Sequence, residues 1–448
     1  MPVAVSCHVL PCPCRYASIM KRGFYSIMAA QFFSSLADNA LFIAAVALLG
    51  HAHEPDWKKA ALVPIFAVFY VLLAPFVGAF SDAHPKGRVM FMSNAIKAVG
   101  CLMMLLGVNP LLAYAVVGLG AASYSPAKYG ILTELLPASQ LVKANGWIEG
   151  LTIISIIMGT VLGGQLIHPN LFAHLQNAGW SAALVSPFGS APQLAIALIM
   201  GVYLIASLIN MRIPHTGVAM IALPKNIFSL LPDFWGCNRL LWRDKLGQIS
   251  LATTTLFWGV SGNLRYLVLA WAALALGYGE TQASMLVGVV AVGTAVGAVW
   301  ASLRVKLDRA TEVMPLGILM GLVVLALLLI KSKGMAIPVF VLLGGLGGYL
   351  VVPMNALLQH RGHNLMGAGR SIAVQNFNEQ ACILGLGLLY SLLTKFHVSA
   401  FGAIVVFGLL VSGCMVLFQL WHWSNLKKHP AEVLRLLREA RDEGPLGH

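Results

Sequence analysis

Charged and polar side chains recur at helical spacing within segments that are otherwise strongly apolar. Four such series are Gln31, Ser34, Ser35 and Asp38; Thr254, Trp258, Ser261 and Arg265; Asn145, Glu149 and Thr152; and Ser371, Gln375, Asn378 and Glu379. Residues three, four or seven positions apart lie on one face of a helix. A guanidinium such as that of Arg265 can bind a phosphate through two hydrogen bonds, and a carboxylate such as Asp38 or Glu149 can accept an ammonium group.

The segments that hold these residues are long and apolar enough to cross a membrane. The chain has 448 residues, of which 58% are hydrophobic and only 10% charged, and its mean hydropathy is +0.81. Soluble proteins usually carry about 25% charged residues, so a soluble fold is excluded. A helix needs about 20 apolar residues to span a bilayer. Twelve segments meet this length, near 24–50, 59–80, 88–108, 110–128, 143–167, 192–212, 249–276, 282–303, 312–331, 335–358, 370–394 and 398–424. We therefore predict an all-α membrane protein with twelve transmembrane helices.

The distribution of basic residues predicts the orientation of these helices. The net charge is +13, and most of the 29 lysines and arginines lie after even-numbered spans or at the two ends of the chain. Cytoplasmic connections carry an excess of Lys and Arg, so we expect both termini to be cytoplasmic. Because the charge is scattered between apolar segments, it does not indicate nucleic-acid binding. Lys97 falls inside the third span, and we interpret it as snorkelling toward the membrane surface.

The spans group into two halves of six. Residues 20–212 form the first half and 249–424 the second. We expect 213–248 to be a cytoplasmic amphipathic linker at the inner leaflet, 425–448 a cytoplasmic amphipathic tail, and 1–19 a disordered extension. The halves repeat each other, because 126–149 and 353–379 both run from a proline through a hydrophilic loop into a polar start of the next span. Parallel six-span halves are typical of transporters.

The connection between the second and third spans carries a further motif. Residues 78–90 read GAFSDAHPKGRVM, with Gly78, Asp82, Gly87 and Arg88 as their key positions. This resembles the G-x-L-A-D-R-x-G-R-R loop of the major facilitator superfamily, although Gly87 and Arg88 come about two residues late. The resemblance implies that the glycine allows close helix approach, and that Asp82 caps a neighbouring helix when the cytoplasmic side is closed.

Longer strings resemble a particular family within that superfamily. They are QFFSSLADNAL at 31–41, YSPAKYGIL at 124–132, LVKANG at 141–146, FWG at 257–259, LRY at 264–266 and VPMNALLQ at 352–359. These are similar to the bacterial lysophospholipid transporters, and the similarity runs from about Met20 to Trp421. The implied fold is the major facilitator type, with two six-helix halves around a central cavity.

The resemblance also implies where the functional residues lie. In the major facilitator fold the first and seventh spans face each other, so Asp38 and Arg265 could pair on the outer side of the cavity. Lys128 could pair with Glu149 or Glu379 on the inner side. The candidate substrate-binding residues are Asp38, Asn39, Lys128, Glu149, Arg265, Gln375 and Glu379, and the candidate gating residues are Asp82, Arg88, Lys128 and Glu149. The alternative is that Asp38 and Arg265 only pack together and that Lys128 is an inside anchor.

The function implied by the resemblance is lipid transport. Members of the family move lysophospholipids, chiefly lysophosphatidylethanolamine, inward across the inner membrane of Gram-negative bacteria, where an acyltransferase re-acylates them. For this chain the resemblance implies a multi-pass inner-membrane protein with a lysophospholipid substrate, membrane lipids around it and a cytoplasmic acyltransferase as a further partner. The alternative is a proton-coupled major facilitator exporter of a small amphipathic molecule.

An enzymatic function has little support in the sequence. The H-x-x-x-x-D spacing of His51 and Asp56 matches an acyltransferase motif only formally, because it lies in a short external loop without a surrounding domain. No G-x-x-x-x-G-K-[ST] loop is present, and the seven cysteines show no metal-binding spacing. We therefore expect a transporter that is not an enzyme and needs no cofactor.

Overall fold

The computed structural model describes residues 13–177, 185–214, 216–278 and 280–441, and the regular structure within these ranges is helical. The N-terminal half comprises α1 (Pro13–His51), α2 (Asp56–Leu72), α3 (Ala74–Ala83), α4 (Lys86–Leu105), α5 (Pro110–Leu135), α6 (Ala138–Leu166), α7 (Pro169–Asn177) and α9 (Ala191–Asn210). The linker holds η1 (Ile227–Ser229) and α10 (Leu230–Arg243). The C-terminal half comprises α11 (Gly247–Leu276), α12 (Glu280–Arg304), η2 (Leu307–Val313), α13 (Pro315–Ala326), η3 (Leu327–Leu329), α14 (Lys333–Met366), α15 (Ala368–Lys395) and α16 (Ala400–Lys428), and α17 (Pro430–Arg441) follows it.

The helices agree with the predicted membrane spans. Nine helices of the described ranges are long and apolar enough to cross a membrane, and the bent pair α2 and α3 would make a tenth. This pair bends by 63°, where Pro75 at the start of α3 has no N–H to continue the helix of α2. Helices α5 and α15, with 26 and 28 residues, are also long enough to span a membrane, and they carry Lys128, Gln375 and Glu379. Together these helices are consistent with twelve spans.

Glycines allow the helices to approach closely at several crossings. A Cβ atom at Gly344 or Gly348 of α14 would overlap the backbone of α12, and one at Gly297 of α12 would overlap α14. A Cβ at Gly159 of α6 would lie 2.5 Å from the carbonyl oxygen of Leu36 in α1. Small residues at such spacing let membrane helices pack backbone to backbone. These crossings hold α12 against α14 and α6 against α1.

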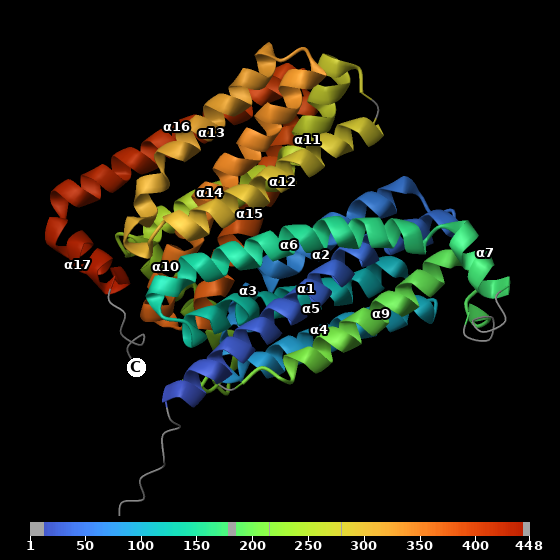
Figure 1. The fold of residues 1–448 in the computed structure, drawn as a ribbon, viewed down its shortest axis with the longest axis horizontal. Helices are drawn as coiled ribbons and strands as arrows, with labels where there is room; N and C mark the ends of the chain where they lie inside the picture. Colours follow the sequence, from blue (N-terminus) through green and yellow to red (C-terminus); the bar gives the residue numbers. More distant parts are fainter. Residues whose placement is uncertain (1–12, 178–184, 215, 279, 442–448) are drawn as a thin grey trace, which may run out of the picture.

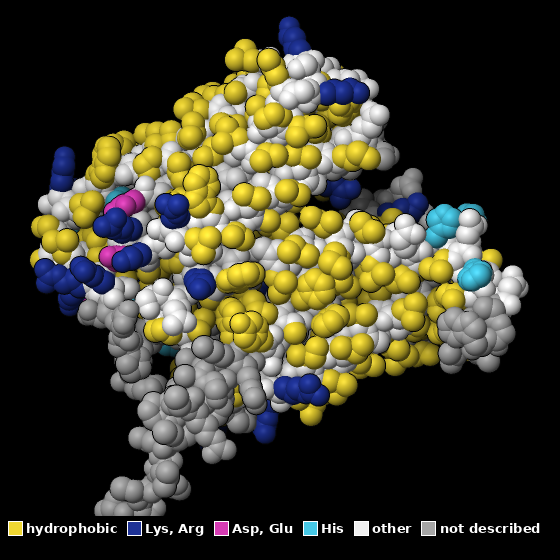
Figure 2. Space-filling view, viewed as in Figure 1, with side chains coloured by type: hydrophobic (Ala, Val, Ile, Leu, Met, Phe, Trp, Pro, Cys, Tyr) yellow, Lys and Arg dark blue, Asp and Glu magenta, His cyan; other side chains and the backbone are white. Residues whose placement is uncertain are grey.

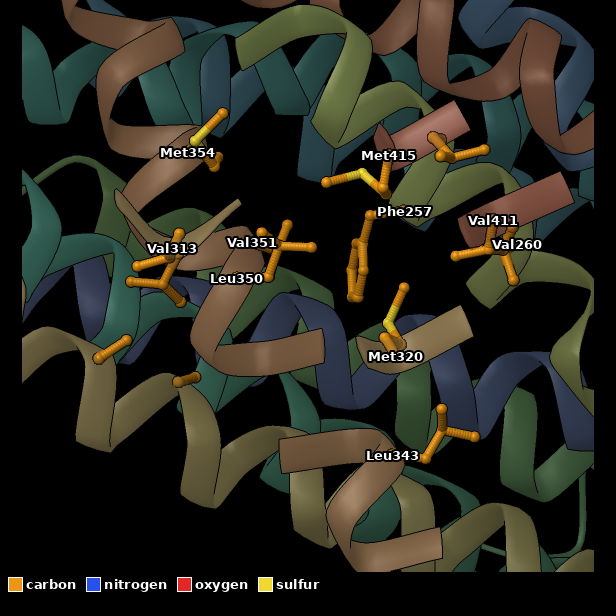
Figure 3. Close-up of a cluster of buried hydrophobic side chains, with 14 of the residues drawn as sticks. Phe257, Val260, Val313, Met320, Leu343, Leu350, Val351, Met354, Val411 and Met415 are labelled. Carbon is orange, nitrogen blue, oxygen red and sulfur yellow. The ribbon is translucent and has the colours of Figure 1, made fainter. Parts of the chain in front are cut away.

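The C-terminal half has a large apolar core. The ring of Phe257 lies between Met320 and Met415, which come from α13 and α16 (Figure 3). Trp271 is fully buried, and its indole N–H donates a hydrogen bond of 3.0 Å to the carbonyl oxygen of Leu327. The bond satisfies the polar atom that this large side chain brings into the core.

The two halves meet at one end of the bundle and separate at the other. The start of α1, the linker helix α10 and the tail helix α17 all lie at one end, called the linker end below (Figure 1). Leu132, Leu141 and Ile148 of the N-terminal half belong to the same buried cluster as the C-terminal core, whereas Leu41 and Leu49, further along α1, belong to a separate cluster. At the opposite end, the far end, the space-filling view shows a cleft between the halves (Figure 2).

The boundaries of the terminal segments differ in part from the predictions. Helix α1 begins at Pro13, so 13–19, which we expected to be disordered, are helical; residues 1–12 lie outside the described residues. The tail holds helix α17, which buries Val433, Leu436 and Ala440. The linker holds helix α10, which buries Leu230, Phe234 and Leu241. Helix α17 contacts both η2 and α6, and therefore both halves.

Candidate functional site

Asp38 lies in a hydrogen-bond network within the N-terminal half. Lys97 Nζ of α4 lies 2.8 Å from each of the two carboxylate oxygens. The hydroxyl of Tyr203, on α9, donates to Asp38 Oδ1 at 2.7 Å. Lys97 also donates to the hydroxyl of Ser34 at 3.1 Å and stands over the ring of Tyr124. The side chain of Lys97 is 1% exposed and that of Asp38 24%, so the lysine neutralises a carboxylate that remains partly accessible.

This network corrects two predictions. Lys97 does not snorkel, because it is buried and paired with Asp38. The predicted pair of Asp38 with Arg265 does not form, and no carboxylate within the described ranges is paired with Arg265, which is exposed. The cause is the arrangement of the helices: α4 brings its lysine onto α1 inside one half, whereas α11 belongs to the other half. Asn39 donates to the carbonyl oxygen of Ser35 at 2.8 Å, within its own helix.

Lys128 and Glu149 are connected through an aromatic ring. The hydroxyl of Tyr129 donates to Glu149 Oε1 at 3.1 Å, and Lys128 Nζ lies 4.1 Å from the centroid of the Tyr129 ring. Lys128 and Glu149 are both buried. A cation over an aromatic face is attracted by the ring quadrupole. Tyr129 therefore bridges the two charges, and the predicted direct ion pair of Lys128 with Glu149 is absent from the described structure.

Glu379 also has a neutral partner. Gln375 donates to Glu379 Oε1 at 2.8 Å and to Asn355 Oδ1 at 3.0 Å. All three side chains are buried. The predicted pairing of Lys128 with Glu379 is therefore wrong for this state of the protein, although Gln375 and Glu379 do lie together as their spacing predicts.

Asp82 connects the two halves at the linker end. Its carboxylate accepts hydrogen bonds from the backbone N–H groups of Gly369, at 2.6 Å, and Arg370, at 2.9 Å, in the first turn of α15. A carboxylate at this place satisfies free N–H groups and interacts favourably with the helix dipole. Gly78 allows the contact, because a Cβ there would lie 2.7 Å from Ala373. The expected helix capping by Asp82 is confirmed.

The basic residue at this contact is Lys86 rather than Arg88. Lys86 Nζ lies 2.8 Å from Asp82 Oδ1 and 3.3 Å from Glu134 Oε1, and all three side chains are buried. Arg88 is exposed, and its gating role stays a prediction. The difference follows from the sequence of the loop, in which Pro85 is the N-cap of α4 and Lys86 is its first residue, four positions after Asp82.

Neutral polar pairs join the halves beside Asp82. Asn145 and Gln359 exchange two amide hydrogen bonds of 2.9 Å, and both side chains are almost fully buried. Asn376 donates to Ser125 at 2.9 Å, and Thr133 lies 3.0 Å from a ring nitrogen of His363. Asn145 belongs to a predicted polar face, but no pattern in the sequence pointed to Gln359 as its partner or to His363 as the partner of Thr133.

A charged cluster ties the linker and the tail to the C-terminal half. The guanidinium of Arg361, on α14, donates to both oxygens of Asp244 at 3.2 and 2.8 Å. It also donates to Glu439 of α17 at 2.8 Å. Asp244 in turn accepts from the N–H of Gly247 at the start of α11. Arg361 thus fixes the end of α10 and helix α17 at the linker end.

The fold has two helical halves joined by polar contacts at the linker end, and comparisons with known proteins give its class. The profile of the Major Facilitator Superfamily matches residues 27–385, so the chain belongs to this superfamily. Solved structures with a similar fold include a bacterial homologue of the iron transporter ferroportin in an outward-facing state, with a TM-score of 0.67 and 17% identity, covering 89% of this chain and 99% of that one. Another is FucP in the outward conformation, with a TM-score of 0.66, 13% identity and coverage of 90% and 98%.

Closer relatives define the family within the superfamily. The chain is 40% identical to the lysophospholipid transporter LplT of Yersinia enterocolitica over 381 residues, which are 85% of this chain and 89% of the relative. It is also 40% identical to LplT of Yersinia pestis over 378 residues, which are 84% and 88% of the two chains. The chain therefore belongs to the LplT family.

Proposed function

We propose that this protein transports lysophospholipids across the bacterial inner membrane by alternating access. Membership of the LplT family, at 40% identity over most of the chain, carries the proposal. The arrangement of the halves supports it, because they are joined by breakable polar contacts at the linker end and separated by a cleft at the far end (Figure 2). A transporter of this type must exchange one closed end for the other.

Arg265 is the proposed phosphate ligand. Its guanidinium is exposed and has no carboxylate partner in the described structure, so it is available to bind an anion. It lies on the same face of α11 as Thr254 and Ser261, at intervals of four and seven residues. A planar guanidinium matches two phosphate oxygens. Asp38 and Asn39 are the proposed neighbours of the headgroup from α1, with Lys97 holding Asp38 in place.

The proposed gate at the linker end consists of Asp82 of α3, which binds the first turn of α15, and of the neutral polar pairs beside it. Lys128 and Glu149, with Tyr129 between them, and Gln375 with Glu379 lie deeper and would meet the headgroup once this end opens. With the linker end placed in the cytoplasm, as the excess of basic residues there favours, the cleft opens outward. We propose that transport runs inward and that a cytoplasmic acyltransferase consumes the lysolipid.

The test is uptake of labelled lysophosphatidylethanolamine into proteoliposomes that contain the purified protein. Arg265→Ala should abolish uptake, whereas Arg309→Ala should not, because Arg309 is an exposed arginine at the linker end outside the proposed path. The recovered lipid should be chemically unchanged, as expected for a transporter. Wild-type uptake by Arg265→Ala would refute the phosphate site, and failure of the wild-type protein to move any lysophospholipid would refute the proposed substrate class.

A further inference from the structure

The linker helix α10 is held against the bundle by one defined face. Leu230, Phe234 and Leu241 on this face are buried, and Phe234 packs beside Ala74 of α3 and Val374 of α15. Polar contacts fix the same face: Asp233 pairs with Arg370 at 3.1 Å, and Asn378 accepts from Trp242 and donates to Asn238. Because so many contacts fix this face, the orientation of the opposite face is fixed as well.

The opposite face combines large apolar side chains with arginines. At helical spacing along η1 and α10 it presents Phe228, Leu231, Trp235, Arg239 and Arg243, all exposed. Phe228 is 74% exposed and Trp235 54%. Such exposed aromatic surface is unfavourable in water, and it normally marks a contact with a partner or a membrane. The only acidic residue of α10, Asp233, is engaged with Arg370, so this face is purely cationic.

The neighbouring span indicates that the face lies at the level of the membrane surface. The ring of Trp242, at the end of α10, stacks on that of Trp421 in α16 with centroids 6.5 Å apart and an interplanar angle of 8°. Trp421 and Trp423 are both exposed on this membrane span. Exposed tryptophans near the end of a span are typical of the boundary between hydrocarbon and headgroups. The stacking therefore places α10 beside that boundary.

We propose that the face formed by Phe228, Leu231, Trp235, Arg239 and Arg243 is a binding surface for anionic phospholipids of the surrounding bilayer. The three apolar side chains would enter the boundary between headgroups and acyl chains, and the two arginines would bind phosphate groups of the headgroups. This is the pattern of an interfacial amphipathic helix, and the absence of acidic side chains on the face favours lipids with a net negative charge. The occupant is the membrane itself and is distinct from the transported lysolipid.

The proposal can be tested with the full-length protein in nanodiscs. A spin label is attached at Leu231→Cys after replacement of the native cysteines, and its collisions with oxygen, which is enriched in lipid, are compared with those of a water-soluble nickel chelate. Nanodiscs of phosphatidylcholine alone are compared with an equal mixture of phosphatidylcholine and phosphatidylglycerol. We expect the label to face lipid in the mixture and to face water more often in phosphatidylcholine alone.

The double variant Arg239→Gln/Arg243→Gln should remove this response. Each basic residue near an anionic surface contributes about a fivefold factor, so loss of both should shift the label toward water by about 25-fold. The control Arg304→Gln/Arg309→Gln removes the same charge from exposed positions at the same end and should leave the label in lipid. A label that faces water in both membranes, equal insertion in both, or an equal loss in the control would each overturn the proposal. Because the readout is lipid contact, a failed transport assay would not affect it.

Discussion

At the scale of single residues, the charged and amide side chains inside the spans have partners that are set by helix packing. Burying an ionisable or amide group inside a membrane span costs free energy, so such groups usually have a polar partner or a function. The sequence therefore singles out Asp38, Glu149, Gln375 and Glu379. Their partners depend on how the helices pack, and helix packing is not encoded in spacing along one helix. Lys97 was visible as a charge within a span, but its pairing with Asp38 requires the position of α4 against α1.

Removing Lys97 should destabilise the protein more than removing the whole pair. In Lys97→Met, Asp38 keeps its charge without a counter-ion, which costs about 3 kcal/mol when a buried pair is broken. The double variant Lys97→Met/Asp38→Asn restores neutrality and should recover most of this loss. Thermal unfolding of the purified protein in detergent measures both, with Arg309→Met as a surface control. Equal stability of the single and double variants would show that the pair is not coupled.

The charge exchange Asp38→Arg/Arg265→Asp should fail to restore uptake. The exchange would place an arginine beside Lys97 and Tyr203, which now surround the Asp38 carboxylate, and would remove the proposed phosphate ligand. Uptake of labelled lysophosphatidylethanolamine should therefore stay near that of Arg265→Ala. Substantial recovery would instead support a direct pair of these two residues in another state of the transport cycle.

At the scale of elements, hydropathy and amphipathicity predicted most of what the structure shows. The apolar spans, the linker helix α10 and the tail helix α17 follow from period and charge alone. The bend between α2 and α3 was missed because the apolar segment runs through it without interruption, although Pro75 was a signal for it. Contacts between halves, such as Asn145 with Gln359, join residues 214 positions apart and need the tertiary fold.

Breaking the amide pair of Asn145 and Gln359 should open the linker end. In Gln359→Leu the buried side-chain oxygen of Asn145 loses its donor, which costs about 1–3 kcal/mol in the closed state, whereas water can satisfy it once this end opens. The double variant Asn145→Leu/Gln359→Leu leaves no unpaired amide and should close again. The distance between spin labels at Lys143 of α6 and Arg309 of η2 reports the change. An unchanged distance in Gln359→Leu would mean that the pair does not control the gate.

Because α10 packs against the bundle, we expect the Cys237 thiol to be alkylated slowly. Burial raises the pKa of the Cys237 thiol above its ordinary value, and the charge of Asp233 raises it further. At a given pH the thiolate fraction is therefore smaller than in a free thiol, and the thiolate is the reactive form. With the other cysteines replaced, the rate of alkylation should keep rising at pH values where that of a free thiol has levelled off. A plateau at the ordinary thiol pKa would place Cys237 outside the packed interface.

At the scale of the whole molecule, the two halves share a buried core at the linker end. Leu132, Leu141 and Ile148 join the buried cluster of the C-terminal half, and Asp82 caps α15 across the same interface. Opening this end must therefore separate apolar surface and several hydrogen bonds at once, which favours a concerted movement of two rigid halves over local fluctuation. Helices α10 and α17 contact both halves, so they should move or be released in the same step.

If the halves move in this way, distances at the two ends should change in opposite directions. Labels at Lys143 and Arg309 report the linker end, and labels at His51 and Phe396, which lie at the ends of α1 and α15 and are exposed, report the far end. Added lysophosphatidylethanolamine should populate a second state, in which the linker-end distance is longer and the far-end distance is shorter than in this structure. Asp82→Ala should favour the same state without substrate, because the first turn of α15 loses its cap. A change at one end alone would rule out rigid halves and would locate transport in a local gate.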